Sequence, residues 1–188
     1  IEQLFADPLS ILRIWEGGLS FHGGFIGVLI SFFIFSKKLN IGFFDLADHI
    51  ALAFPIGLGF VRIGNFLGGE LLGRPTDFPW GMIFWSDPLQ ISRHPSQLYQ
   101  AFFEGVVLFT ILNLLVIKPK PKIFISGMFL ALYGSFRIFT EIFRMPDSHI
   151  GFDFLDIITR GQLLSTPMVI IGLLLIFLSY RNKNETIS

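Results

Sequence analysis

The chain has 188 residues, of which 52% are hydrophobic and 15% charged, with a formal net charge of zero and a mean hydropathy of +0.66. Soluble domains usually carry about a quarter charged residues, so this composition predicts an integral membrane protein. The balanced charge gives no electrostatic reason to expect nucleic acid as a partner. The sequence contains no cysteine, which excludes disulfides, thiolate metal sites and a thiol nucleophile supplied by the chain itself.

The N-terminal stretch does not look like a targeting signal. The chain begins with Ile1, and residues 1–19 contain neither a basic leader nor an apolar core, so they are not expected to form a signal peptide. We expect that the chain lacks its natural start, and that residues 1–18 form a loop at the membrane interface.

Five apolar stretches of about the 20 residues needed to cross a bilayer follow. They lie at about 19–36, 48–67, 95–117, 123–145 and 162–180. They predict an all-α polytopic membrane protein with about five transmembrane helices in a single domain, residues 1–188. Asp45 and Asp48 precede or open the second stretch and are expected to cap the N-terminus of its helix.

Segment 68–94 is too polar and too rich in proline to cross a membrane. We predict a loop region there, with Trp80 and Trp85 at the headgroup level. All six lysines of the chain lie in alternate connections or in the C-terminal tail. Because lysine and arginine in short loops mark the cytoplasmic side, 68–94 and the 146–160 loop are predicted to be external.

With this topology, the ionisable residues of the predicted spans gather at one depth. Those in the outer half or near the middle of the membrane are His22, Arg62, Glu104, Arg137, Glu141 and Arg144. Ionisable side chains are costly inside a bilayer and usually serve a function or bind a partner there. The pattern therefore predicts one polar cavity that opens toward the external leaflet.

The fourth predicted span carries the clearest local pattern. Tyr133, Arg137, Glu141 and Arg144 are spaced by four, four and three residues, which places them on one helix face. Arg137 and Glu141 are therefore expected to form an ion pair. Such a pair can also be purely structural and hold two helices together.

The arginines together suggest an anionic ligand. Arg62, Arg137 and Arg144 suit a phosphate group, since guanidinium donates paired hydrogen bonds to phosphate oxygens. The alternative is a structural network in which Glu104 or Glu70 balances the arginines. Both alternatives stay open from the sequence.

Glycines and histidines give weaker signals. The glycines within 62–74 are compatible with a binding loop or with a tight re-entrant turn only. His22, followed by two glycines, is predicted either to accept a proton near neutral pH or to be structural. His94 is expected either at a helix cap or interface or in the site. No two histidines show metal-ligand spacing, so no metal and no cofactor is predicted.

Four sequence blocks resemble the prolipoprotein diacylglyceryl transferase family. They are Ser20-Phe-His-Gly-Gly-Phe-Ile-Gly27, Arg62-Ile-Gly-Asn-Phe with Glu70 and Gly73-Arg74, Arg93-His-Pro-Ser-Gln-Leu-Tyr99, and Tyr133-Gly-Ser-Phe-Arg-Ile-Phe-Thr-Glu141. They occur in the family's order, and the resemblance covers essentially the whole chain. The chain departs from the signature at Val61, where glycine is usual, and at Gly68, where asparagine is usual. Since the family has seven spans, the resemblance implies that this chain lacks the first two.

The resemblance implies an enzyme of the bacterial inner membrane with its active site toward the periplasmic leaflet. Such an enzyme transfers the diacylglyceryl group of phosphatidylglycerol to the lipobox cysteine thiol in a preprolipoprotein signal peptide. A thioether forms and glycerol phosphate leaves. The implied partners are these two substrates and membrane lipid. The alternative class is a transporter or scramblase of anionic phospholipid, for which basic residues should continue toward the cytoplasmic half.

The resemblance also implies roles for individual residues. Arg62 would bind the phosphatidylglycerol headgroup, and Arg137, held by Glu141, would stabilise the departing phosphate. Tyr133 and Asn65 would supply hydrogen bonds, and His22 would help to deprotonate the thiol. Further candidates for the site are Glu104, Glu70, Gly73 and Arg144.

Overall fold

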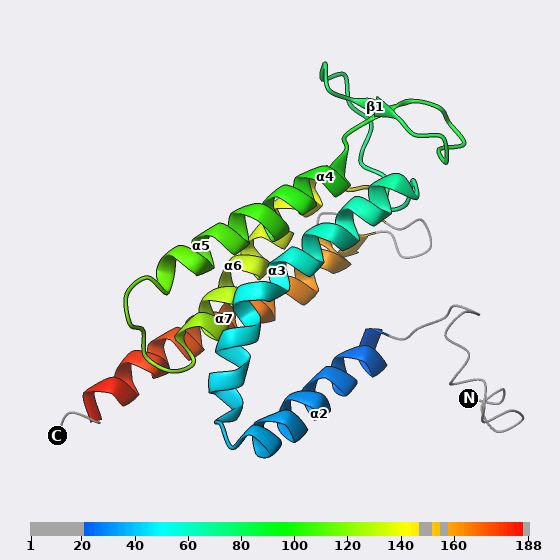
Figure 1. Cartoon of the computed structure of the whole chain (residues 1–188). Coiled ribbons are helices and arrows are strands. Elements are labelled where there is room, and N and C mark those ends of the chain that lie inside the picture. Colours follow the sequence, from blue (N-terminus) through cyan, green and yellow to red (C-terminus); the bar gives the residue numbers. More distant parts are fainter. Residues whose placement is uncertain (1–20, 147–151, 155–157, 186–188) are drawn as a thin grey trace, which may run out of the picture. The chain divides into compact units, whose positions relative to one another are not determined.

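The computed structural model describes residues 21–146, 152–154 and 158–185, and these are mostly helical (Figure 1). Within these ranges, three helices are long and apolar enough to cross a membrane. They are α3 (Phe43–Leu67), a continuous helix over Ser96–Leu115, and the segment Arg160–Arg181 of α7 (Arg160–Glu185). A polytopic all-α membrane protein, as predicted, fits this structure; the number of five spans stays a prediction.

Two further helices stand at the positions of the first and fourth predicted spans. They are α2 (Phe21–Leu39) and α6 (Phe124–Thr140). At 17 residues, α6 is shorter than predicted, because the chain after Thr140 tightens into the 3₁₀ turn η4 (Glu141–Phe143). The chain divides into two compact units, Ile1–Leu46 and Ala47–Ser188. The single domain over residues 1–188 stays a prediction.

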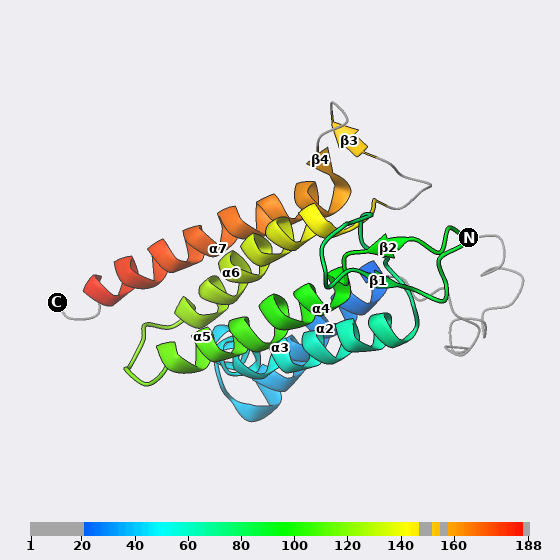
Figure 2. The ribbon, with the colours of Figure 1, turned by 90° about the horizontal axis from the view of Figure 1, so that it is seen from above.

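In the second unit, α6 and α7 lie side by side in both views (Figures 1 and 2). Small residues form this contact. A Cβ atom added at Gly127 would lie 3.0 Å from the Gly172 carbonyl oxygen, and one added at Gly172 would lie 2.5 Å from the Ala131 nitrogen. Because hydrocarbon chains give no hydrophobic drive for two membrane helices to associate, such close backbone packing holds them together.

The continuous helix consists of α4 (Ser96–Gln100), the π-helix η3 (Ala101–Val107) and α5 (Leu108–Leu115). A second contact between glycines joins it to α3, where a Cβ atom added at Gly105 would lie 2.9 Å from the Gly59 Cα. Segments of π-helix are rare and occur often at functional sites. Glu104 lies in this one.

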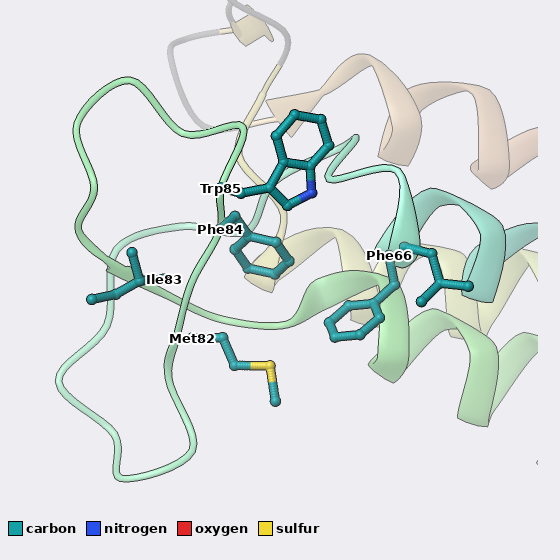
Figure 3. Close-up of a pocket in the computed structure, with 6 residues that line it drawn as sticks. Phe66, Met82, Ile83, Phe84 and Trp85 are labelled. Atoms are coloured by element: carbon teal, nitrogen blue, oxygen red, sulfur yellow. The ribbon is translucent and has the colours of Figure 1, made fainter.

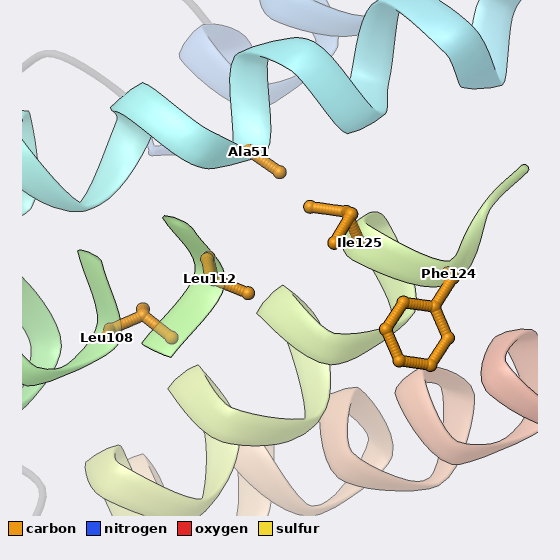
Figure 4. Packing of buried hydrophobic residues seen from close by; sticks show 5 residues of the cluster. All are labelled: Ala51, Leu108, Leu112, Phe124 and Ile125. Carbon is orange, nitrogen blue, oxygen red and sulfur yellow. The ribbon is translucent and has the colours of Figure 1, made fainter. Parts of the chain in front are cut away.

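The hydrophobic core of the second unit lies where α3, α5 and α6 meet (Figure 4). Its buried members are Ala51, Leu108, Leu112, Phe124 and Ile125.

Next to this core, the Asp48 carboxylate accepts hydrogen bonds from the backbone nitrogens of Ile123 (2.9 Å) and Ser126 (2.8 Å) and from the Ser126 hydroxyl. The prediction that Asp48 caps its own helix is therefore wrong. Since α3 already begins at Phe43, Asp48 lies inside it and caps α6 instead, satisfying N–H groups that a helix start leaves without partners.

Region 68–94 contains an antiparallel hairpin of β1 (Met82–Ile83) and β2 (Ser92–Arg93), with Met82 opposite Arg93. A second hairpin pairs β3 (Phe152–Phe154) with β4 (Ile158–Thr159). The first hairpin holds a buried ion pair in which Arg93 donates from Nε and Nη2 to Asp87 at 2.7 and 3.0 Å. The hydrogen bond from Arg93 lowers the pKa of the Asp87 carboxyl below its usual value of 3.8.

The same region is bonded to the chain that follows α6. The Arg74 nitrogen donates to the Phe143 carbonyl at 2.9 Å, and the Met145 nitrogen donates to the Leu72 carbonyl at 3.0 Å. The Arg74 side chain donates from Nε to the Arg144 carbonyl at 3.0 Å. These bonds hold the end of the glycine-rich segment 62–74 against the chain that follows α6.

Candidate functional site

The Glu104 side chain lies at the centre of a cluster of charged residues and is fully buried. Its Oε2 accepts a hydrogen bond from Arg62 Nε at 3.1 Å, and its Oε1 lies 3.7 Å from Arg137 Nη1. The Thr140 hydroxyl also donates to Oε1, at 3.4 Å. Residues of α3, η3 and α6, which are far apart in the sequence, thus meet at one carboxylate.

Glu141 extends this cluster toward Arg144. Its Oε2 lies 3.1 Å from Arg137 Nη2, and its Oε1 lies 3.5 Å from Arg144 Nη1. The prediction of one continuous helix face is wrong in part, because α6 ends at Thr140. The 3₁₀ turn nevertheless brings residues three apart onto one side, so the pair between Glu141 and Arg144 forms.

The first turn of α7 also contacts Glu141. A Cβ atom added at Gly161 would lie 2.7 Å from the Glu141 carboxyl carbon and Oε1. Glycine at this position leaves room for the carboxylate beside a helix N-terminus, where the helix dipole favours negative charge. Gly161 was not among the residues predicted from the sequence.

The sequence left Glu104 and Glu70 as alternative partners for the arginines, and the structure identifies Glu104. Glu70 is exposed, and its Oε2 accepts a hydrogen bond from Asn65 Nδ2 at 3.0 Å. The arginine side chains of the cluster are 10–14% exposed, so their charges are only weakly screened by solvent. This geometry suits both of the alternatives from the sequence, an anion-binding site and a structural network.

Tyr133 and Gly73 take different places around the cluster. The Tyr133 hydroxyl lies beside the Arg62 guanidinium and within electrostatic range of Glu104 and Arg137. Gly73 pairs with Arg144 in an isolated β-bridge, and a side chain there would collide with the His94 carbonyl oxygen. Gly73 therefore allows close approach of two backbone segments, a packing role.

The structure places one of the two candidate histidines, His94, and does not describe the side chain of the other, His22. His22 lies in the first turn of α2, but its side chain lies outside the described residues. His94 precedes α4, and its ring contacts those of Phe78, Tyr99 and Phe143. Its Nδ1 lies 3.2 Å from the Tyr99 hydroxyl, and burial lowers the pKa of the imidazole. His94 is therefore part of an aromatic contact in the loop region.

Three polar residues near the cluster were missed from the sequence. Thr140, Gln97 and Gln100 are at most 1% exposed. Gln97 Nε2 donates to the Glu70 carbonyl, at 2.5 Å. The sequence contained a signal for the two glutamines, because Gln97, Gln100 and Glu104 follow one another at helical spacing within an apolar stretch.

An apolar pocket of about 240 Å³ lies between the last turn of α3 and the 68–94 region. Figure 3 shows Phe66 and Phe84 in this pocket, with ring centroids 5.8 Å apart. Its other lining residues are Leu67, Met82, Ile83 and Trp85. Phe66 lies four residues after Arg62, so this apolar lining begins about one helical turn from the charged cluster.

Over the part of the chain that the structure describes, no group of three or more histidine, aspartate or glutamate residues could hold a metal ion.

Comparison with known proteins gives consistent matches. The profile of a family described as prolipoprotein diacylglyceryl transferase matches residues 2–178. A phosphatidylglycerol–prolipoprotein diacylglyceryl transferase of Pseudomonas syringae pv. syringae is 53% identical over 183 residues, covering 96% of this chain and 68% of the relative. A relative of the same name from Teredinibacter turnerae is 52% identical over 176 residues, with coverages of 94% and 61%. Another, from a Marinomonas species, is 55% identical over 166 residues, with coverages of 88% and 62%. The chain thus spans 61–68% of the length of these relatives.

Proposed function

The chain belongs to the prolipoprotein diacylglyceryl transferase family, and we propose that it transfers the diacylglyceryl group of phosphatidylglycerol to a prolipoprotein. The predicted family and the predicted enzyme class, a transferase, are confirmed by these relatives. Their names favour transfer over transport of phospholipid. The acceptor is the thiol of the lipobox cysteine in the signal peptide of a preprolipoprotein.

The reaction exchanges a carbon–oxygen bond for a carbon–sulfur bond. The thiolate attacks the carbon of the diacylglyceryl group that carries the phosphodiester oxygen, and a thioether forms. The carbon–oxygen bond breaks, and its electron pair leaves with glycerol phosphate. A base takes the thiol proton. The chain has no cysteine of its own, in agreement with a thiol that belongs to the substrate.

The observation that carries the proposal is the convergence of Arg62 and Arg137 on Glu104. The three arginines of the cluster outnumber its two carboxylates, which leaves the cluster with one excess positive charge, and negative charge increases on the phosphate as it leaves. Arg137 Nη1 is buried and has no hydrogen-bond partner among the described residues. A phosphate oxygen would accept its hydrogen bond.

The remaining residues orient the arginines, bind the lipid or shape the loop beside the site. Glu141 holds Arg137 at 3.1 Å and keeps its guanidinium aimed at the phosphate. Tyr133 and Asn65 supply hydrogen bonds to the lipid. Glu104 and Arg144 complete the charge network, while Glu70 and Gly73 set the conformation of the loop beside it.

His22 is proposed to act as the base that deprotonates the thiol. A cysteine thiol has a pKa near 8.5, so a base or a nearby positive charge raises its thiolate fraction at neutral pH. His22→Gln should then lower the rate, and raising the pH should restore part of it. An unchanged pH profile would exclude this role.

The proposed site lies at the periplasmic leaflet of the inner membrane, in a protein that crosses it several times, here with five spans. The lysines of the loops and tail support this orientation. The exposed side chains of Trp80 and Trp85 suit the membrane–water interface of the external side.

The test uses the whole protein in lipid vesicles, with phosphatidylglycerol and a lipobox peptide as substrates. Arg62→Ala and Arg137→Ala should each lower the rate of thioether formation by about 100-fold or more, the size of effect seen when a group that stabilises transition-state charge is removed. Arg181→Ala, at the far end of α7, is the control and should keep its rate. Near-normal activity of either site variant would refute the phosphate site. Lipid movement between leaflets without thioether would instead indicate a scramblase.

A further inference from the structure

The Gln100 side chain is 1% exposed, and neither its Nε2 nor its Oε1 has a hydrogen-bond partner among residues 21–146, 152–154 and 158–185. Two other amides have an unused oxygen only, because the Gln97 and Asn65 nitrogens donate to Glu70. Gln97 Oε1 and Asn65 Oδ1 are buried and likewise have no partner within those ranges. Together the three side chains present three acceptor oxygens, and Gln100 also a donor nitrogen, that the described residues do not use.

Such groups are costly when left without partners. A buried amide group without a hydrogen bond costs about 1–3 kcal/mol, and Gln100 contributes a donor and an acceptor at once. A leucine at this position would have filled similar space without that cost. The amide is therefore expected to meet a partner that comes from outside the described residues.

The position of Gln100 connects this amide to the charged cluster. Gln100 lies four residues before Glu104, whose carboxylate contacts Arg62 and Arg137. It lies three residues after Gln97, which donates to the Glu70 carbonyl. Gln100 thus lies between the 68–94 region and the two arginines, about 6 Å along the helix from Glu104 at a rise of about 1.5 Å per residue.

We propose that Gln100, with Gln97 and Asn65, binds the hydroxyl groups of an uncharged polyol headgroup while the arginines hold its phosphate. This inference rests on the proposed function and deepens it, since it names the residues that select the lipid. A hydroxyl group both donates and accepts a hydrogen bond, which matches the two free atoms of an amide. An ammonium headgroup only donates, and it would lie beside two guanidiniums that repel it.

The experiment compares two lipids that differ only in the headgroup hydroxyls, phosphatidylglycerol and phosphatidylpropanol. The whole protein in vesicles is assayed with each lipid and one lipobox peptide. The wild type should show a kcat/KM about 3- to 30-fold higher with phosphatidylglycerol, the change in rate that one or two neutral hydrogen bonds produce. Gln100→Leu should lose most of that preference and keep its rate with phosphatidylpropanol within about two-fold.

Stability provides a readout that separates a ligand role from a structural one. Because no described residue is hydrogen-bonded to the Gln100 amide, its removal leaves none of them without a partner, and Gln100→Leu should unfold at the wild-type temperature or above. Asn113→Leu is the matched control on α5. The Asn113 amide donates to the Leu52 and Phe109 carbonyls, so this variant should lose stability and affect both lipids equally.

Several results would overturn the inference. They are a wild type that does not distinguish the two lipids, a Gln100→Leu variant that loses activity equally with both, and a Gln100→Leu variant that unfolds earlier. The last two would assign Gln100 to the structure or to a bound water molecule. Thermal stabilisation by each lipid, measured without peptide, tests headgroup recognition apart from turnover. If phosphatidylglycerol stabilises the wild type more than phosphatidylpropanol but no thioether forms, the transfer reaction is refuted and the binding of the headgroup hydroxyls is not.

Discussion

Replacing Glu104 by glutamine removes the carboxylate charge that lies against Arg62 and Arg137 while keeping the shape of the side chain. Glu104 is fully buried, and the two arginine side chains are 14% and 13% exposed. Removing one partner of a buried ion pair costs about 3–5 kcal/mol, because the other charge is left uncompensated. Arg137 retains Glu141 at 3.1 Å, so we expect a loss in the free energy of unfolding of about 2–3 kcal/mol.

The assay is thermal unfolding of the whole protein in a mild detergent, followed by circular dichroism. At roughly 2–4 °C per kcal/mol for a chain of this size, Glu104→Gln should unfold about 4–12 °C below the wild type. Asp77→Asn, which neutralises an exposed carboxylate of the loop region, should stay within about 2 °C. Added phosphatidylglycerol should stabilise Glu104→Gln more than the wild type, since its phosphate then replaces the missing carboxylate.

A double-mutant cycle with Arg62→Gln isolates the pair. If the 3.1 Å contact holds both charges, the double variant should be less destabilised than the sum of the single variants, by about 0.5–3 kcal/mol. Strict additivity, or a Glu104→Gln protein that unfolds at the wild-type temperature, would refute the electrostatic reasoning and leave the cluster without an energetic role.

Two further predictions concern the 68–94 region and its junction with α4. Burial lowers the pKa of His94 below 6.5, so the folded state binds fewer protons than the unfolded one. The segment around Tyr99 should therefore lose hydrogen-exchange protection as the pH falls from about 6.5 toward that lower pKa; His94→Gln should remove this dependence, and equal wild-type protection at both pH values would contradict it. Gly73→Ala should destabilise by about 1–3 kcal/mol because the new methyl group meets the His94 carbonyl. Gly64→Ala meets nothing within 4 Å and should show no loss in a melting experiment; a tolerated Gly73→Ala would contradict the close packing.

The charged cluster could be predicted because charges within apolar segments need partners. Arg62, Arg137 and Glu141 stood out in the sequence for this reason, and the structure brings all three together. The choice between Glu104 and Glu70 could not be made from the sequence, since it depends on how α3 and η3 cross. Gln100 was not predicted to lie in the site, because an uncharged amide in an apolar helix does not need a partner of opposite charge.

Other features depend on bonds between segments that are distant in the sequence. The Asp48 carboxylate binds the start of α6, 75 residues away at Ile123, and nothing in the local pattern distinguishes this from a cap on its own helix. The buried pair of Asp87 and Arg93 lay in a segment that looked like an ordinary polar loop. Its order comes from the hairpin between β1 and β2, whose two-residue strands are too short to leave a periodic pattern.

Glycines set the distances within the cluster. Gly59 and Gly105 meet at the crossing of α3 and η3. Arg62 and Glu104 lie within one helical turn of that crossing. Because the two backbones approach closely there, the Arg62 and Glu104 side chains can reach each other and form their 3.1 Å contact. Gly161 similarly leaves the space that the Glu141 carboxylate occupies. Side chains at these positions would separate the helices by the width of at least a methyl group. The ion pairs would then lengthen although every charged residue is still present. The glycines beside the charged residues are therefore as much a part of this site as the charges themselves.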